Sequence, residues 1–257
     1  SSMSSYDIVK TINDENARVS IAIEQALPEI AKACDAVANA IQNGGRVFYM
    51  GAGTSGRLGV LDAVECPPTF GVDYETVMGI IAGGSKCLTA ASEGQEDDPN
   101  GGIAELESRH LTANDVVVGI SAAGGAAYVN NAIAYAKALG CVTVGISCNP
   151  GSKLEQLSRI PITPDTGAEA LTGSTRLKAG NAQKMILNML STGAMVQSGH
   201  VYENMMINLK PTNIKLRARV IRIVREITSL SEEAAIDLLE KANWVIRDAL
   251  RLWKEEA

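Results

Sequence analysis

A glycine-rich turn between an apolar run and a helical segment constrains the fold of this 257-residue chain more than any other feature. Residues 46–50, RVFYM, have the apolar, β-branched and aromatic profile of a buried parallel strand. The turn GAGTSG follows at once, and apolar residues then recur at helical spacing from Leu58. A strand, a turn and a helix start in this order direct free backbone N–H groups and the positive end of the helix dipole at one point. The stretch therefore predicts an anion site.

A phosphate is the anion that this turn favours, because Thr54 and Ser55 follow Gly53 with two hydroxyl donors. The spacing matches neither GxGxxG for dinucleotides nor GxxxxGK[ST] for nucleoside triphosphates, and no lysine follows the turn. A small phosphorylated metabolite is thus favoured over a nucleotide. On these residues alone the alternative stays open that the glycines serve only a tight strand-to-helix turn.

Composition narrows the class of protein further. Aromatic residues make up only 4% of a chain that is 46% hydrophobic, which indicates an aliphatic core of the kind that helix-covered sheets have. The net charge of −6 argues against non-specific binding to nucleic acid or to an anionic membrane. Two histidines and five cysteines without CxxC spacing indicate neither a metal site nor a disulfide framework, which fits a reducing cytoplasm. We recognise no signal peptide and no apolar run of transmembrane length.

Apolar strand-like runs alternate with helical segments through the middle of the chain. Strands are predicted at residues 46–50, 75–82, 115–121, 142–147 and 159–163. This alternation predicts an α/β fold, a three-layer αβα sandwich with a five-stranded parallel sheet and right-handed crossovers. We divide the chain into N-terminal helices (residues 1–43, two helices separated near Pro28), an α/β domain (44–209) and a C-terminal helical segment (210–257).

The loops that follow the strands carry candidate functional residues. The acidic loop 85–102, which contains Glu96, follows the second strand, and Ser121 ends the third. Open α/β sheets bind ligands at this carboxyl edge, although an acidic loop that is merely solvated is the alternative. Ser174 and Thr175 lie in a hydroxyl-rich turn before a long helix. That turn is either a second anion-binding helix start or an N-cap, and the residues alone favour the cap.

Prolines and charges shape the other helices. Pro67 and Pro68 are expected to end the helix that carries Glu65. Residues 210–227 form a predicted basic helix, but without a nucleic-acid motif, and in an acidic protein, a solvated or subunit-facing surface is favoured. Two further helices, the first capped by Ser231, complete the chain.

Four ordered motifs carry a family resemblance: GAGTSGRLGVLDAVECPPTFG, GIIAGGSKCLTAASEGQED, GISCNPGS and LTGSTRLKAGNAQKMILNMLSTGAM. Together they resemble the N-acetylmuramic acid 6-phosphate etherases of the sugar isomerase (SIS) superfamily, from about Asp7 into the helical tail. The chain is expected to be shorter than typical members at both ends. The resemblance implies a SIS fold for residues 44–209 and a cytoplasmic, cofactor-free lyase of cell-wall sugar recycling. It also implies a homodimer with sites between subunits, which converts N-acetylmuramate 6-phosphate into N-acetylglucosamine 6-phosphate and D-lactate.

The resemblance also assigns residues. The two acid/base glutamates of the family fall on Glu65 and Glu96. In the open-chain aldehyde the C2 proton is acidic, so that Glu96 is expected to abstract it while Glu65 protonates the departing lactyl oxygen, and water then adds to the unsaturated aldehyde. No metal or redox cofactor is needed for this chemistry. The phosphate loop and the further phosphate-binding candidates are Gly53, Thr54, Ser55, Ser121, Ser174 and Thr175.

One loop departs from the family pattern. Residues 123–128 read AGGAAY, where the family usually has SGRTPY, so that two hydroxyls and a guanidinium are lost. Asn181, in place of the usual threonine, is a milder change. Weaker phosphate binding is expected, and two alternatives stay open: a non-catalytic sugar-phosphate sensor similar to the glucokinase regulatory protein, and a sugar-phosphate isomerase. The presence of both glutamates favours the etherase.

Overall fold

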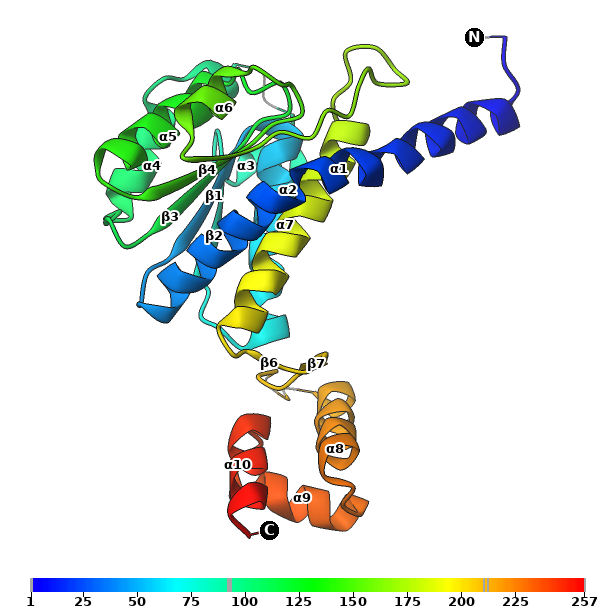
Figure 1. The fold of residues 1–257 in the computed structure, drawn as a ribbon, viewed down its shortest axis with the longest axis vertical. Coiled ribbons are helices and arrows are strands. Elements are labelled where there is room, and N and C mark those ends of the chain that lie inside the picture. The colour runs from blue at the N-terminus through cyan, green and yellow to red at the C-terminus, as the bar shows by residue number, and fades with distance from the viewer. Residues whose placement is uncertain (1, 92–93, 210, 212, 257) are drawn as a thin grey trace.

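A five-stranded parallel sheet forms the centre of the molecule, as predicted (Figure 1). The structure, a computed structural model, describes residues 2–91, 94–209, 211 and 213–256. The strands lie in the order β2-β1-β3-β4-β5. Their bounds are β1 (Val47–Gly51), β2 (Val77–Ile81), β3 (Val116–Ile120), β4 (Val142–Ile146) and β5 (Ile160–Ile162).

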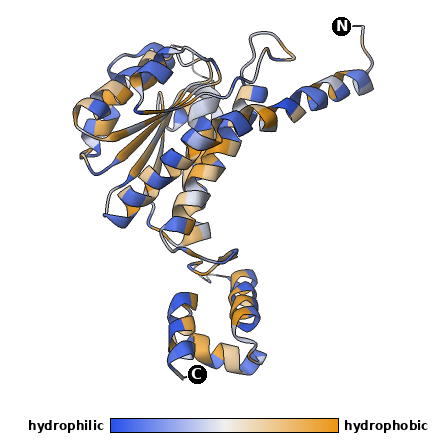
Figure 2. Cartoon of the chain, in the orientation of Figure 1, coloured by the Kyte–Doolittle hydropathy of each residue, from blue (hydrophilic) through white to orange (hydrophobic). Residues whose placement is uncertain are grey.

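Helices cover both faces of this sheet. One face carries α1 (Ser5–Gln42), α2 (Gly53–Phe70) and α7 (Lys178–Gln197); the other carries α4 (Gly101–Ser108), α5 (Ala127–Ala138) and α6 (Lys153–Leu157). Side chains alternate between the two cores along each strand, so that Tyr49 packs with α1, α2 and α7 while Phe48 packs with α4 and α5. Both strand faces are therefore apolar, and Figure 2 shows the hydrophobic strands in the interior.

The N-terminal segment is one helix, and the prediction of two helices divided at Pro28 was wrong. Proline removes the hydrogen bond to the carbonyl of Glu24, but both residues lie on the exposed side of α1, which faces solvent. On the opposite side, buried residues from Val19 to Val37 pack continuously along the core, and this packing keeps the helix intact across the proline. The first part of α1 projects from the body (Figure 1).

Helix α2 also continues past its prolines, contrary to expectation. It includes Pro67 and Pro68 and ends at Phe70. Gly71 closes it with a left-handed φ of 70°, and its N–H donates to the Pro67 carbonyl at 2.9 Å. Buried Phe70 anchors this last turn in the core, which explains why the helix outlasts the prolines.

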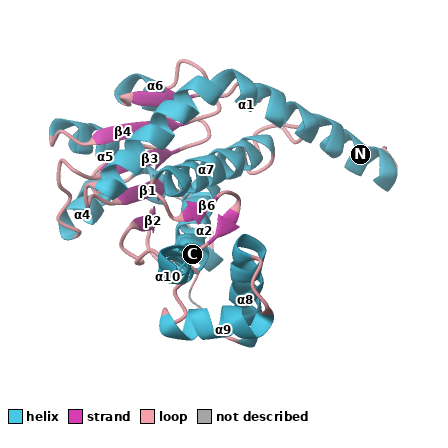
Figure 3. Cartoon of the chain, turned by 60° about the horizontal axis from the view of Figure 1, so that its bottom comes forward, coloured by secondary structure: helices cyan, strands magenta, loops and turns pink. Residues whose placement is uncertain are grey.

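The C-terminal segment forms a small helical unit with its own core. After α7, a short antiparallel ribbon of β6 (Val201–Tyr202) and β7 (Met205–Met206), which was not predicted, leads to α8 (Ile214–Thr228), α9 (Glu232–Lys241) and α10 (Ile246–Glu256). The predicted start of the basic helix at residue 210 lies outside the described residues. Figure 3 shows the three helices packed together below the sheet. The apolar side chains of these helices, together with Ile207 and Leu209 before them, form a core separate from the two sheet cores. We therefore propose that the C-terminal helical segment, predicted at residues 210–257, is a distinct unit.

Two short elements complete the fold, α3 (Lys86–Thr89) and the 3₁₀ helix η1 (Gln95–Asp97), both in the loop after β2. Among the residues that the structure describes, no helix is both long enough and apolar enough to cross a membrane.

Candidate active site

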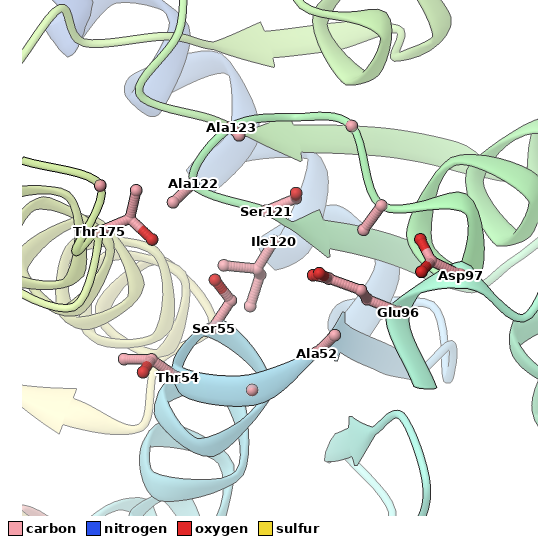
Figure 4. A pocket seen from close by; sticks show the side chains of 14 residues that line it. Ala52, Thr54, Ser55, Glu96, Asp97, Ile120, Ser121, Ala122, Ala123 and Thr175 are labelled. Atoms are coloured by element: carbon pink, nitrogen blue, oxygen red, sulfur yellow. The ribbon is translucent and has the colours of Figure 1, made fainter. Parts of the chain in front are cut away.

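A cavity of about 490 Å³ opens at the carboxyl edge of the sheet. The start of α2, the end of β3, the 3₁₀ helix η1 and the turn before α7 surround it (Figure 4). These elements are far apart in the sequence, and the sheet brings them together because parallel strands end at a common edge. The size falls in the range of small-molecule sites, which is about 300–1,000 Å³.

The glycine-rich turn forms one wall of this cavity. A Cβ at Gly51 would lie 2.6 Å from the Gly56 nitrogen, and Gly53 has a left-handed φ of 53°, so that only glycine suits either position. Ala52 precedes the helix in an extended conformation and provides no side-chain cap. The first N–H groups of α2 therefore remain available to an anion in the cavity.

Hydroxyl groups line the same region. Thr54, Ser55, Ser121 and Thr175 all contribute to the cavity wall, with Ser55 and Ser121 largely buried. The Ser55 hydroxyl donates to the side-chain oxygen of Gln183 on α7 at 3.0 Å.

The hydroxyl-rich turn before α7 does not cap that helix, so the N-cap interpretation was wrong. Helix α7 begins at Lys178, and the carboxylate of Glu169 accepts from the Lys178 and Ala179 N–H groups at 2.9 and 3.0 Å. A side chain of this chain thus occupies the N-terminus of α7. Thr175 lies in the cavity wall instead, and Ser174 is its neighbour but does not line the cavity.

Two carboxylates face these donors from η1. Glu96 and Asp97 both line the cavity, and Figure 4 shows the Glu96 side chain reaching into it. Arg57 of α2 fixes the loop that leads to η1, because its guanidinium donates to the carbonyls of Leu88 and Ala90 at 3.1 and 3.0 Å. Asp97 was not among the predicted site residues, although its place beside Glu96 in the EGQED motif gave the signal.

Comparison with known proteins gives the family. A model of the glucokinase regulatory protein N-terminal SIS domain matches residues 29–137, and a SIS domain model matches residues 101–193. The chain is 52% identical to N-acetylmuramic acid 6-phosphate etherase of Enterobacter sp. (strain 638), over 96% of this chain and 84% of that protein. It is 51% identical to the etherase of Cronobacter sakazakii, over 95% and 82% of the two chains. The chain belongs to the N-acetylmuramic acid 6-phosphate etherase family.

Solved structures agree on the fold. Phosphoheptose isomerases from Francisella tularensis and Neisseria gonorrhoeae each superpose with a TM-score of 0.57, at 17% and 14% identity. The matches cover 75% and 74% of this chain and 98% of each isomerase chain. At such low identity the likeness establishes only the shared SIS fold.

Glu65 lies apart from the cavity at the carboxyl edge of the sheet. It is exposed on α2, ten residues beyond Ser55, a distance of about 15 Å along the helix axis. Within one chain the structure thus brings Glu96 to the hydroxyl-bearing wall but does not bring Glu65 there. The predicted residues that line the cavity are Gly53, Thr54, Ser55, Glu96, Ser121 and Thr175.

No basic side chain is among the fourteen described residues that line the cavity. The exposed Gly125 occupies the wall position where the family usually has arginine. An anion here would depend on backbone N–H groups, helix dipoles and hydroxyls. In the described part of the chain no three His, Cys, Asp or Glu side chains form a group that could hold a metal ion.

Proposed function

We propose that this protein cleaves the D-lactyl ether of N-acetylmuramic acid 6-phosphate in the cytoplasm, giving N-acetylglucosamine 6-phosphate and D-lactate in cell-wall sugar recycling. One observation carries the proposal: Glu96 faces a wall of hydroxyls and a free helix N-terminus in one cavity, in a chain about half identical to etherases. The phosphate would lie against Thr54, Ser55 and Ser121, where the α2 dipole favours negative charge.

The chemistry is an elimination followed by hydration. When the sugar ring opens, the C1 aldehyde acidifies the C2 proton, and the Glu96 carboxylate removes it. The C3–oxygen bond then breaks and lactate departs as its ether oxygen gains a proton. Water adds to the double bond at C3 while C2 regains a proton. General acid and general base groups each contribute about 10²–10⁴-fold to such steps.

A second copy of the chain would supply the general acid. Glu65 lies on the outer face of α2 beside Leu61 and Val64, which are 44% and 49% exposed. Further apolar side chains, including Ile8 and Ile12, are exposed on the projecting part of α1. Such surfaces are typical of contacts between identical subunits. We propose a homodimer in which Glu65 of one copy completes the cavity of the other.

The test is release of D-lactate from N-acetylmuramic acid 6-phosphate, measured with a D-lactate dehydrogenase. Wild type should release lactate, the unphosphorylated sugar should react far more slowly, and Glu96→Gln should lose at least about 10²-fold in kcat. Asp97→Asn is the matched control, because it changes a neighbouring carboxylate in the same wall. Binding of the sugar phosphate without lactate release would indicate a sensor, and aldose–ketose interconversion would indicate an isomerase; either result refutes the proposal.

A further inference from the structure

We propose that Gln183 is a positioning residue that turns the Ser55 hydroxyl proton toward the bound phosphate and thereby sets phosphate affinity. This inference rests on the proposed function, since that function places a phosphate in the cavity. Gln183 lies on α7 and is only 1% exposed, so that it does not touch the cavity contents itself. It acts through Ser55, which lines the cavity and is its hydrogen-bond partner across the α2–α7 interface.

The hydrogen bond between them has a functional consequence. A serine hydroxyl has one proton, and here that proton is donated to Gln183 Oε1 at 3.0 Å. Ser55 then offers only oxygen lone pairs to the cavity, and these repel a phosphate oxygen. If the amide turns by 180°, Gln183 Nε2 donates to Ser55 Oγ and the Ser55 proton is free to bind the phosphate.

The present state of the amide supports this exchange. Gln183 Nε2 is buried and, among the described residues, has no hydrogen-bond partner. The neighbours of Gln183 three and four residues away on the same helix face include Ala179, Ile186 and Leu187, which are apolar and buried. At such a position an amide whose N–H donor has no partner lowers the stability of the fold, whereas a methionine side chain would leave no donor unpaired. Packing therefore does not explain a glutamine here, whereas orientation of Ser55 does.

Gln183→Met and Gln183→Glu test the proposal. Methionine has a side chain of similar length but lacks the Nε2–H donor. Glutamate places a carboxylate there, which holds the Ser55 proton and adds negative charge. The probe is N-acetylglucosamine 6-phosphate, with Kd measured by calorimetry beside N-acetylglucosamine and inorganic phosphate. We expect the Kd for the phosphorylated sugar to rise about 2- to 10-fold with methionine, because Ser55 Oγ loses the Nε2–H donor that turns its proton toward the phosphate. With glutamate we expect a rise of about tenfold or more, because the carboxylate keeps the Ser55 proton and the hydrogen bond to the charged phosphate is lost. The Kd for N-acetylglucosamine should not change.

Two measurements separate this role from a structural one. The melting temperature of Gln183→Met should equal or exceed that of the wild type, although phosphate binding weakens. In a Ser55→Ala background the same substitution should have no further effect on Kd, because the two residues act as a unit. Gln197→Met is the matched control, at an exposed position near the other end of α7.

An unchanged Kd in both Gln183 variants, or an effect that adds fully to that of Ser55→Ala, would overturn the positioning role. Failure of the wild type to bind either phosphate probe would also overturn it. A wild type that binds the phosphorylated sugar but releases no lactate would refute the proposed function alone, since these binding measurements require no turnover.

Discussion

Substituting Gly125 by arginine tests the phosphate side of the cavity most sharply. Gly125 lines the cavity, its φ lies outside the left-handed region, and no atom lies within 4 Å of where a Cβ would be. The backbone therefore accepts an arginine without strain. The new guanidinium would be the first basic group among the described residues of a wall that already contains Glu96 and Asp97.

The expected gain follows from a balance of three effects. Each hydrogen bond to a charged group contributes about 1.5–3 kcal/mol, and a guanidinium can donate two to one phosphate. Ordering the long side chain costs about 2 kcal/mol. Glu96 and Asp97 compete for the same guanidinium, which restricts the net gain to about 1–2 kcal/mol, or a 5- to 30-fold lower Kd.

Calorimetry with N-acetylglucosamine 6-phosphate measures this gain, with N-acetylglucosamine as the ligand that lacks the phosphate. Affinity should increase only for the phosphorylated sugar, and the increase should shrink as salt is added. Ala138→Arg, at the exposed far end of α5, adds the same charge away from the cavity and is the control. Equal Kd values for wild type and Gly125→Arg, or the same change in the control, would show that residue 125 does not face the phosphate.

Three further experiments test the fold and the shared site. Burial alone would raise the pKa of Asp115, but hydrogen bonds from Arg46 and from the backbone lower it, so the ion pair stabilises the fold above the unfolded-state pKa and is lost on acidification. Asp115→Asn should lower the free energy of unfolding by about 2 kcal/mol at pH 7 in urea titrations, which is less than the roughly 3–5 kcal/mol of a fully buried pair because Arg46 is partly exposed. This deficit should shrink as the pH falls through the folded-state pKa of Asp115. Burial raises the pKa of Asp62, so the folded protein holds this proton more tightly than the unfolded chain does. Asp62→Asn should therefore raise the melting temperature relative to wild type by an amount that grows as the pH rises above the unfolded-state pKa, and a constant difference would contradict this. Mixing inactive Glu65→Gln with inactive Glu96→Gln under subunit exchange should restore up to about a quarter of the wild-type activity if the two glutamates meet between copies; a mixture that stays inactive despite exchange would refute the shared site.

The sheet could be predicted because its information is local. Parallel strands buried on both faces are short apolar runs, and all five lie where such runs occur. The glycine-rich turn was equally visible in the sequence, and Gly53 adopts a left-handed φ of 53° there. The position of Glu96 followed from topology, because the loop after β2 emerges at the ligand-binding edge.

The predictions were wrong where packing between segments distant in the sequence determines the local structure. Pro28 would end an isolated helix, but core contacts on both sides of it keep α1 continuous. Glu169, nine residues before the start of α7, accepts hydrogen bonds from the first N–H groups of that helix. The N-cap preferences used in sequence analysis concern only the residue directly before a helix, so they do not indicate this partner. Gln183 meets Ser55 across 128 residues of chain, so that only the fold reveals the pair. The role proposed for Glu65 requires a second copy of the chain, since one chain leaves this side chain exposed and outside the cavity.

Deuterium incorporation tests the central claim, that Glu96 initiates an elimination by removing the C2 proton. The reaction is run in D₂O, and the sugar phosphate product is analysed by mass spectrometry and NMR after exchangeable positions are returned to hydrogen. With wild type, every product molecule should carry one deuterium at C2, and Glu96→Gln should form neither product nor deuterated substrate. Lactate release at the wild-type rate with hydrogen retained at C2 would mean direct displacement and would contradict the account.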